Sequence, residues 1–181
     1  MKRSSISLFL IVVLSIVITG CLTVEKKEYT FQMKDNNSGT LTIKFINLMS
    51  MMDDTTDVSG ADYVELMNSY INGSQIESDY ENAIVRSKRL FEENGVLCGE
   101  VIVDFTDLNS VGLFQYDAKG PYMLNVGSFL EGETFLNSNG DYGGDVMPVV
   151  FWPKGNETLT LTTYVTTPDE TTVGLLSHYK K

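Results

Sequence analysis

The stretch 83-AIVRSKRLFEENGVLCGEVIVDFTD-107 decides the fold, because it joins two strand-like runs through Asn94-Gly95. Asn-Gly is the preferred pair for a two-residue type I′ turn between antiparallel strands. Such a turn fixes the register, so that Arg89 lies opposite Glu100. Opposite charges directly across two strands stabilise the pairing. The stretch therefore predicts a β-hairpin.

The second strand of this hairpin has one apolar face. Val101, Val103 and Phe105 alternate with other residues, so they are expected to face the core. The same register places Cys98 on the other face, opposite Phe91. Cys98 is one of two cysteines in the chain, and in a strand it is expected to be buried and inert.

Upstream of the hairpin, residues 29–34 and 40–48 predict two strands around a turn at residues 35–39. In the second strand, Leu41, Ile43 and Phe45 alternate with polar residues. That alternation indicates one buried and one solvated face.

A helix is predicted from Ser59 to the stop signal Asn72-Gly73. Ser59 is expected to be its N-cap, with Asp62 as the capping-box partner three residues later. The apolar stripe at helical spacing consists of Tyr63, Leu66, Met67 and Tyr70.

Downstream of the hairpin, short strand-like runs alternate with turns. Strands are predicted at residues 111–116 and 122–129, followed by a long loop at 131–145. A last hairpin is predicted from residues 146–152 and 158–166.

The C-terminus is predicted to be helical from Thr167-Pro168 onward, with Val173, Leu176 and Tyr179 on its buried side. Strands outnumber helices, and no alternation of strands and helices indicates a parallel sheet. The predicted fold is α+β: a largely antiparallel sheet of about eight strands, one helix after the second strand and one C-terminal helix.

The N-terminus has the pattern of an export signal. Lys2-Arg3 precede an apolar run from Ile6 to Ile18, and the chain turns polar after Cys21. This run of thirteen residues would span roughly 20 Å as a helix, short of the ~30 Å core of a bilayer. Its last residues, Ile18-Thr19-Gly20-Cys21, resemble the lipobox of bacterial lipoproteins.

The resemblance implies that the chain is cut before Cys21 and that the Cys21 thiol carries a diacylglyceryl group. Residues 1–20 would then be a signal peptide, residues 21–28 a lipidated N-terminus with a short tether, and residues 29–181 a single globular domain. Cell-envelope localisation follows. Leu22, where an aspartate would favour inner-membrane retention, favours the outer membrane of a Gram-negative cell. Otherwise the protein would lie on the outer face of the plasma membrane. The alternatives are an uncleaved membrane helix and an ordinary export signal with a coincidental cysteine.

Charge and composition limit the classes of function and the domain organisation that the chain can have. The chain has 13 basic and 24 acidic residues, and removal of Lys2 and Arg3 leaves a net charge of 11 − 24 = −13. Nucleic-acid binding needs a basic face, so it is not expected. About 160 mature residues with one remaining cysteine suit one domain that depends on its apolar core rather than on disulfides.

Catalytic motifs are not found in the sequence, and no metal site or cofactor is predicted. His178 is the only histidine, and it is expected to be a solvated surface residue. Carboxylate pairs such as Asp53 with Asp54, or Asp141 with Asp145, leave open a hydrolase that uses carboxylates alone. Such spacing in sequence does not give the separation that this chemistry requires.

The candidate ligand site lies within the polar loop at 131–145. Its proposed residues are Asn137, Asn139, Asp141, Tyr142 and Asp145. Alternating oxygen side chains are typical of the start of a calcium loop, but Tyr142 occupies the glycine position and Pro148 the position of the bidentate glutamate. The other interpretation is a polar connection that binds nothing.

Together these observations predict a lipid-anchored envelope protein that acts as a non-catalytic binding or assembly module. Its expected partners are membrane lipid through the modified cysteine, and an envelope protein or glycan. The alternative is a lipid-anchored hydrolase.

Replacing Cys21 by serine should leave the protein uncleaved at this site and without covalent lipid, because the thiol is the group that is modified. Intact-protein mass spectrometry measures both effects, and Cys98→Ser is the matched control that should keep the lipid. A wild-type mature protein with an unmodified N-terminus would contradict the prediction.

Overall fold

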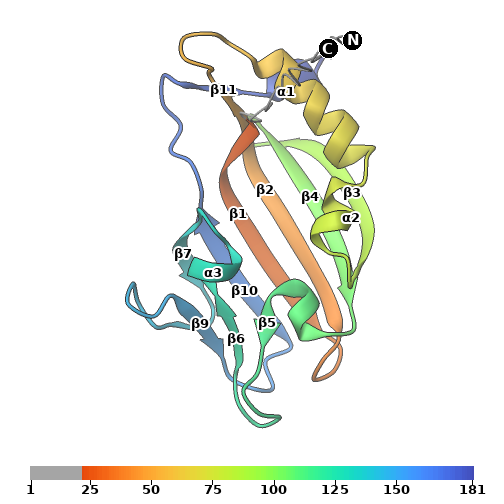
Figure 1. Cartoon of the computed structure of the whole chain (residues 1–181), viewed down its shortest axis with the longest axis vertical. Helices are drawn as coiled ribbons and strands as arrows, with labels where there is room; N and C mark the ends of the chain where they lie inside the picture. Colours follow the sequence, from red (N-terminus) through yellow and green to blue (C-terminus); the bar gives the residue numbers. More distant parts are fainter. Residues whose placement is uncertain (1–21) are drawn as a thin grey trace, which may run out of the picture.

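The computed structural model describes residues 22–181, which form two antiparallel sheets (Figure 1). The large sheet has seven strands: β1 (Leu22–Met33), β2 (Gly39–Met51), β3 (Ile84–Glu93), β4 (Val96–Phe105), β7 (Thr134–Ser138), β10 (Thr158–Tyr164) and β11 (Thr172–Gly174). The small sheet has four: β5 (Leu113–Phe114), β6 (Tyr122–Asn125), β8 (Asp141–Tyr142) and β9 (Val149–Trp152).

The helical elements are short and lie between the strands in sequence. They are α1 (Ser59–Glu65), the π-helix η1 (Leu66–Ile71), α2 (Gln75–Asp79), the 3₁₀-helix η2 (Leu108–Val111), α3 (Val126–Phe129) and α4 (Leu176–Tyr179). The α+β class with a largely antiparallel sheet is confirmed. The described chain has more strands than the eight predicted, and they are divided between two sheets.

The large sheet has the order β3-β4-β2-β1-β10-β7, with β11 pairing alongside the end of β2. In Figure 1, α1 and α2 lie over the β3 and β4 side of this sheet, and the small sheet with α3 lies over the lower part of the β10 and β7 side. The main core fills the space between the two sheets, where Phe31 of β1 lies 6.4 Å from Trp152 of β9, measured between ring centroids.

The central hairpin has the predicted register. Arg89 pairs with Glu100, and its Nε lies 2.7 Å from Oε1 of that glutamate. Asn94 and Gly95 have φ angles of 52° and 80°, as a type I′ turn requires.

The predicted faces of the hairpin are confirmed as well. Val101, Val103 and Phe105 lie in the main core. Cys98 pairs with Phe91 and is a buried free thiol, and burial raises the pKa of that thiol.

The predicted tether at residues 22–28 is corrected, because these residues are the first half of strand β1. All of them except Glu25 pair with β2, and those from Lys26 onward pair with β10 as well. Val24 is only 5% exposed. The charged run that resembles a flexible linker is a strand because its backbone is hydrogen-bonded on both sides. Cys21 itself lies outside the described residues.

The last hairpin is also corrected. Strand β9 pairs with β6 and β8, whereas β10 pairs with β1 and β7, so the two runs belong to different sheets. The turn between them carries the chain from one layer to the other. The predicted loop at 131–145 contains β7 and β8, and residues 126–129 form α3, for which the Asn125 side chain accepts a hydrogen bond from Ser128 N.

The helix predicted from Ser59 is present as α1 and η1, but its predicted cap is not, and the C-terminal helix begins later than predicted. Ser59 is not the N-cap: Asp57 accepts a hydrogen bond from Ser59 N, and Asp62 accepts one from the Ser50 hydroxyl. At the C-terminus, residues 172–174 pair with β2 as strand β11, so the helix begins only at Leu176. The helix starts later than predicted because residues 172–174 form hydrogen bonds with the edge of β2 instead of a helical turn.

Substituting Gly95 by valine should destabilise the protein by more than about 1 kcal/mol, because a β-branched residue resists the positive φ of the turn. A Cβ at Gly95 would meet no atom within 4 Å, so a clash would not explain the loss. Gly174→Val is the matched control: its site is equally open and its φ is not positive. Equal urea midpoints for the two variants would contradict the type I′ assignment.

Candidate functional site

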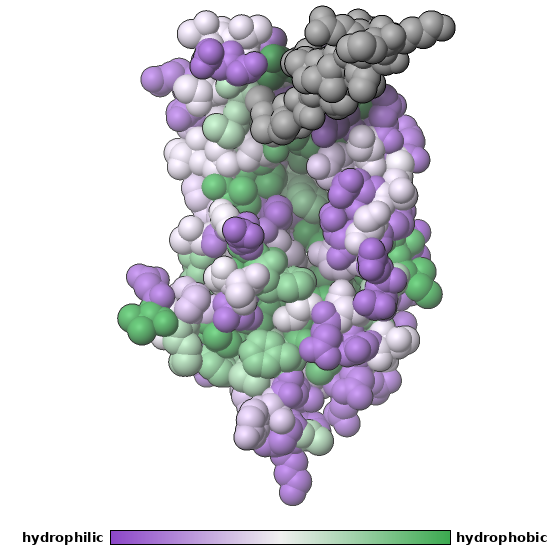
Figure 2. All heavy atoms as spheres, in the orientation of Figure 1, coloured by the Kyte–Doolittle hydropathy of each residue, from purple (hydrophilic) through white to green (hydrophobic). Residues whose placement is uncertain are grey.

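A cavity of about 240 Å³ lies between the inner face of the large sheet and the helical segment α1–η1–α2. On the face shown in Figure 2, hydrophobic residues are visible in a recessed strip between more polar flanks. The apolar side chains that line the cavity include Leu22 and Val24 of β1, Phe45 and Leu48 of β2, Leu66, Tyr70 and Ile71 of η1, and Leu90 of β3.

Ile76 and Val101 of the cavity wall belong to the main core, whereas Val24, Leu48 and Leu66 belong to a second hydrophobic cluster. The buried members of that cluster are Val24, Leu48, Leu66, Leu97 and Leu175. These residues come from β1, β2, η1, β4 and the segment before α4. Because the wall draws on so many parts of the chain, the shape of the cavity depends on the whole fold.

Gly99 leaves room on the sheet side of the cavity. A Cβ at this position would lie 3.5 Å from Leu48 Cδ1, 3.6 Å from Leu90 Cδ2 and 3.7 Å from Phe45 Cβ. These are ordinary contact distances, so alanine fits and any larger side chain would extend into the open space. The space on this side of the cavity therefore exists because Gly99 of β4 has no side chain.

The opposite wall belongs to the π-helix η1, which supplies Leu66, Tyr70 and Ile71. Short π-helical turns widen a helix and are frequent at functional sites. Lys88 of β3 fixes the end of this wall, since its ammonium donates to the carbonyl of Gly73 at 2.6 Å and pairs with Glu77 at 2.8 Å.

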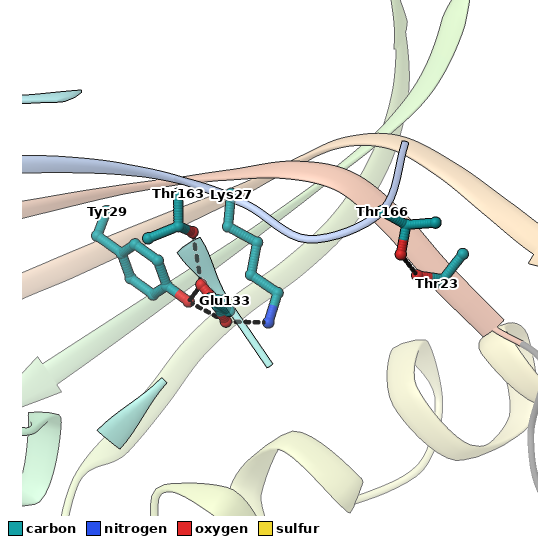
Figure 3. Close-up of polar contacts among 6 residues, drawn as sticks. All are labelled: Thr23, Lys27, Tyr29, Glu133, Thr163 and Thr166. Atoms are coloured by element: carbon teal, nitrogen blue, oxygen red, sulfur yellow. Dashed lines mark hydrogen bonds and ion pairs between the residues drawn. The ribbon is translucent and has the colours of Figure 1, made fainter. Parts of the chain in front are cut away.

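A buried polar cluster adjoins the cavity at Lys27 (Figure 3). Lys27 Nζ lies 2.6 Å from Oε1 of Glu133, whose side chain is only 4% exposed. The Tyr29 hydroxyl donates to both carboxylate oxygens, at 2.9 and 3.0 Å, and the Thr163 hydroxyl donates to Oε2. The Glu133 carboxylate is thus held by one cation and two hydroxyl groups.

The Tyr29 hydroxyl keeps its proton in this cluster. Burial, followed by the neighbouring Glu133 charge, raises the pKa of the Tyr29 phenol far above its usual range. The phenol therefore remains a hydrogen-bond donor at any physiological pH. The cluster joins β1, β10 and the segment before β7. Its role is to hold these three parts of the chain in position.

A second polar contact lies near the start of β1. The hydroxyls of Thr23 and Thr166 are 2.6 Å apart (Figure 3). Thr23 lines the cavity, and Thr166 follows β10. The contact therefore lies at the edge of the cavity, next to the N-terminal end of β1.

The residues of the predicted ligand loop have structural partners. Asn139 Oδ1 accepts hydrogen bonds from the Trp152 indole and from Thr160 N, both at 2.8 Å. The ring of Tyr142 stacks on Phe135, with centroids 3.9 Å apart. These two residues hold the small sheet against the large one.

The other three residues of the predicted site are exposed. Asn137 lies in β7, Asp141 lies in β8, and Asp145 follows β8. Within residues 22–181, no group of three or more histidine, cysteine, aspartate or glutamate side chains is placed to hold a metal ion.

His178 is half-buried rather than fully solvated. Its Nε2 lies 3.0 Å from Oγ of Ser59, and its ring stacks on Tyr63 with centroids 5.8 Å apart. Ser59 is only 2% exposed, which leaves its hydroxyl no open path to a substrate. The contact joins α4 to the start of α1.

Comparison with known protein families gives no match, and neither the curated proteins nor the solved structures provide one. Among residues 22–181, no helix combines the length and hydropathy needed to cross a membrane.

The cavity was missed at the level of sequence because its parts are far apart in the chain. A glycine inside a strand can mark a close approach of other groups, so Gly99 was the one available local signal. The pairing of Lys27 with Glu133 joins residues 106 positions apart and has no local signal.

Replacing Lys27 by methionine should destabilise the protein by about 2 kcal/mol or more, because it leaves a buried carboxylate without its cation. Glu133→Gln should cost about 1 kcal/mol, since the amide can still accept from Tyr29 and Thr163. The double variant Lys27→Met/Glu133→Gln should be more stable than Lys27→Met alone. Urea unfolding of the four proteins measures this, and purely additive losses would contradict the pairing.

Proposed function

We propose that this protein is a lipid-anchored, non-catalytic binding protein of the cell envelope, whose domain holds a small apolar ligand in the cavity beneath η1. The observation that carries the proposal is the cavity of about 240 Å³, lined mainly by aliphatic and aromatic side chains. Most ligand sites are concave and mainly apolar with a few polar groups, and this site has that composition.

The volume is large enough for a ligand. An apolar cavity of about 150 Å³ can hold a benzene molecule, and a water-sized group occupies about 30 Å³ of liquid. The cavity therefore has room for roughly eight groups of the size of a methylene. Burying eight methylenes at ~0.8 kcal/mol each would supply on the order of 6 kcal/mol before the costs of association.

The polar groups beside the cavity favour binding over catalysis. Lys27 is paired with Glu133, and Arg89 is paired with Glu100. A general acid or base needs a proton donor or acceptor directed at the substrate, whereas these groups are directed at each other. The carboxylate pairs considered for a hydrolase, such as Asp53 with Asp54, are exposed and lie outside the cavity.

The envelope location rests on the lipobox-like residues that end at Cys21. Two or three acyl chains on this residue would hold the protein at a membrane, since each buried methylene adds ~0.8 kcal/mol. The two parts of the proposal are independent: the anchor is tested by the Cys21→Ser variant, and the cavity by ligand binding.

Filling the cavity should abolish binding of an apolar fluorescent probe. We expect the vesicle-reconstituted protein to bind a naphthylamine dye, and Gly99→Leu to weaken that binding at least tenfold because the new side chain occupies the space. Dye dissolved in the bilayer gives the same background for every variant, so differences between variants report on the cavity.

Two matched variants make this test specific. Gly174→Leu adds the same side chain at an open surface position and should bind like wild type. Gly99→Ala, which fits at contact distance, should bind with intermediate strength and shows whether a loss follows the added volume. Unchanged dye binding in a folded Gly99→Leu protein, judged by circular dichroism, would disprove the proposed site.

A further inference from the structure

The cavity begins where the proposed anchor ends. Leu22, Thr23 and Val24 all line it, and Cys21 directly precedes them. Consecutive Cα atoms are about 3.8 Å apart, so a lipid on Cys21 would hold this end of the cavity at the surface of the bilayer. This step rests on the proposed function, because it requires both the anchor and an apolar site.

Strand β1 also defines how deep the cavity reaches. Lys27, which lines the cavity too, lies five residues beyond Leu22. At ~3.3 Å per residue along a strand, the two are separated by roughly 17 Å. The cavity is therefore elongated along β1, with one end at the anchor and the other beside the pair of Lys27 with Glu133.

The two ends differ in polarity. At the anchor end the wall is formed by residues such as Leu22, Val24 and Val165. At the other end the Lys27 stem lines the cavity, while its ammonium is neutralised by Glu133. A neutralised ion pair neither attracts a ligand carboxylate nor admits an apolar chain end, so it acts as a stop for a chain that enters from the anchor end.

We propose that the ligand is an acyl chain of a phospholipid from the membrane that carries the anchor. The chain enters tail first at Leu22 and runs along β1 between Gly99 and η1. Its methyl end lies near Lys27, and its headgroup stays at the bilayer surface. The cavity has room for roughly eight methylene groups, so the rest of the chain remains outside it.

The bilayer is the favoured source of the acyl chain because the cavity wall starts at Leu22, directly after the proposed anchor. A cavity for a ligand from the aqueous phase has no need to border the anchor, whereas one that takes a lipid chain must open at the bilayer. The net charge of −13 of the mature chain keeps the remainder of the domain away from anionic headgroups, so the apolar end next to the anchor is the part that meets the membrane.

Photolabelling of the full lipoprotein in vesicles tests this proposal. Two phosphatidylcholines are used, one with a diazirine at the methyl end of an acyl chain and one with a diazirine about eight carbons from that end. After irradiation, mass spectrometry locates the labelled residues. We expect the methyl-end probe to label the deep wall, at Ile76 and Val101, and the mid-chain probe to label Leu22, Thr23 and Val24.

Variants establish that labelling occurs inside the cavity. Gly99→Leu should reduce labelling by the methyl-end probe at least fivefold, and Gly174→Leu should leave it unchanged. Labelling that is confined to outer surfaces, or that is equal in wild type and Gly99→Leu, would overturn the proposal. The reverse depth order would show a headgroup-first ligand and would also overturn it.

The outcomes separate this inference from the proposed function. If the naphthylamine dye binds in the cavity but neither lipid labels it, the cavity is a binding site and the membrane-lipid inference fails. If neither dye nor lipid enters, both fail. If lipid labelling appears only after mild alkaline hydrolysis has removed the ester-linked acyl chains of the anchor, the occupant is a chain of the protein's own anchor, and the proposed phospholipid occupant is wrong.

Discussion

The pairing of strand β1 with β2 on one side and β10 on the other is the constraint on which the rest of the structure depends. Through this pairing β1 contributes to three environments. Phe31 and Tyr29 lie in the main core, Lys27 lies in the polar cluster, and Val24 lies in the wall of the cavity. Because side chains alternate along a strand, a shift of one residue would move Lys27, Tyr29 and Phe31 together to the outer face.

The polar cluster divides the inner face of the large sheet. On one side of it the small sheet packs against the large one, and on the other side the helical segment leaves a cavity. Placing a carboxylate at this boundary is costly unless it is fully paired, and Glu133 has a cation and two hydroxyl donors. The cluster joins β1, β10 and the segment before β7, and it lies beside the end of the cavity that Lys27 lines.

Local interactions made part of this fold predictable. The central hairpin has the expected register because two residues, Asn94 and Gly95, determine the turn and the turn determines the pairing. Non-local pairing explains the errors. The charged start of β1 has the composition of a linker, and it is a strand only because β2 and β10 flank it. The runs at β9 and β10 look like a hairpin, but their partners lie in two different sheets.

The same distinction applies to the site. Asn139 and Tyr142 have the residue types of a ligand loop, but their side chains are used to hold Trp152 and Phe135 in place. The cavity depends on a side chain that is absent at Gly99 and on the distance between a sheet and a helix. Composition and spacing do not report such a distance, so the position of a cavity is a property of the assembled fold.

The strand character of residues 22–28 changes how the domain would sit at a membrane. A flexible tether of seven residues would allow an extension of roughly 25 Å and free rotation of the domain. A strand that is paired from Leu22 onward allows neither, since Leu22 already pairs with Ser50. With Cys21 as the anchor, the orientation of the domain follows from the direction of β1. The acidic body is then directed away from the headgroups, and the apolar end of the cavity is directed toward them. Attachment through the first residue before a central strand would thus link the proposed membrane anchor to the position of the proposed binding site.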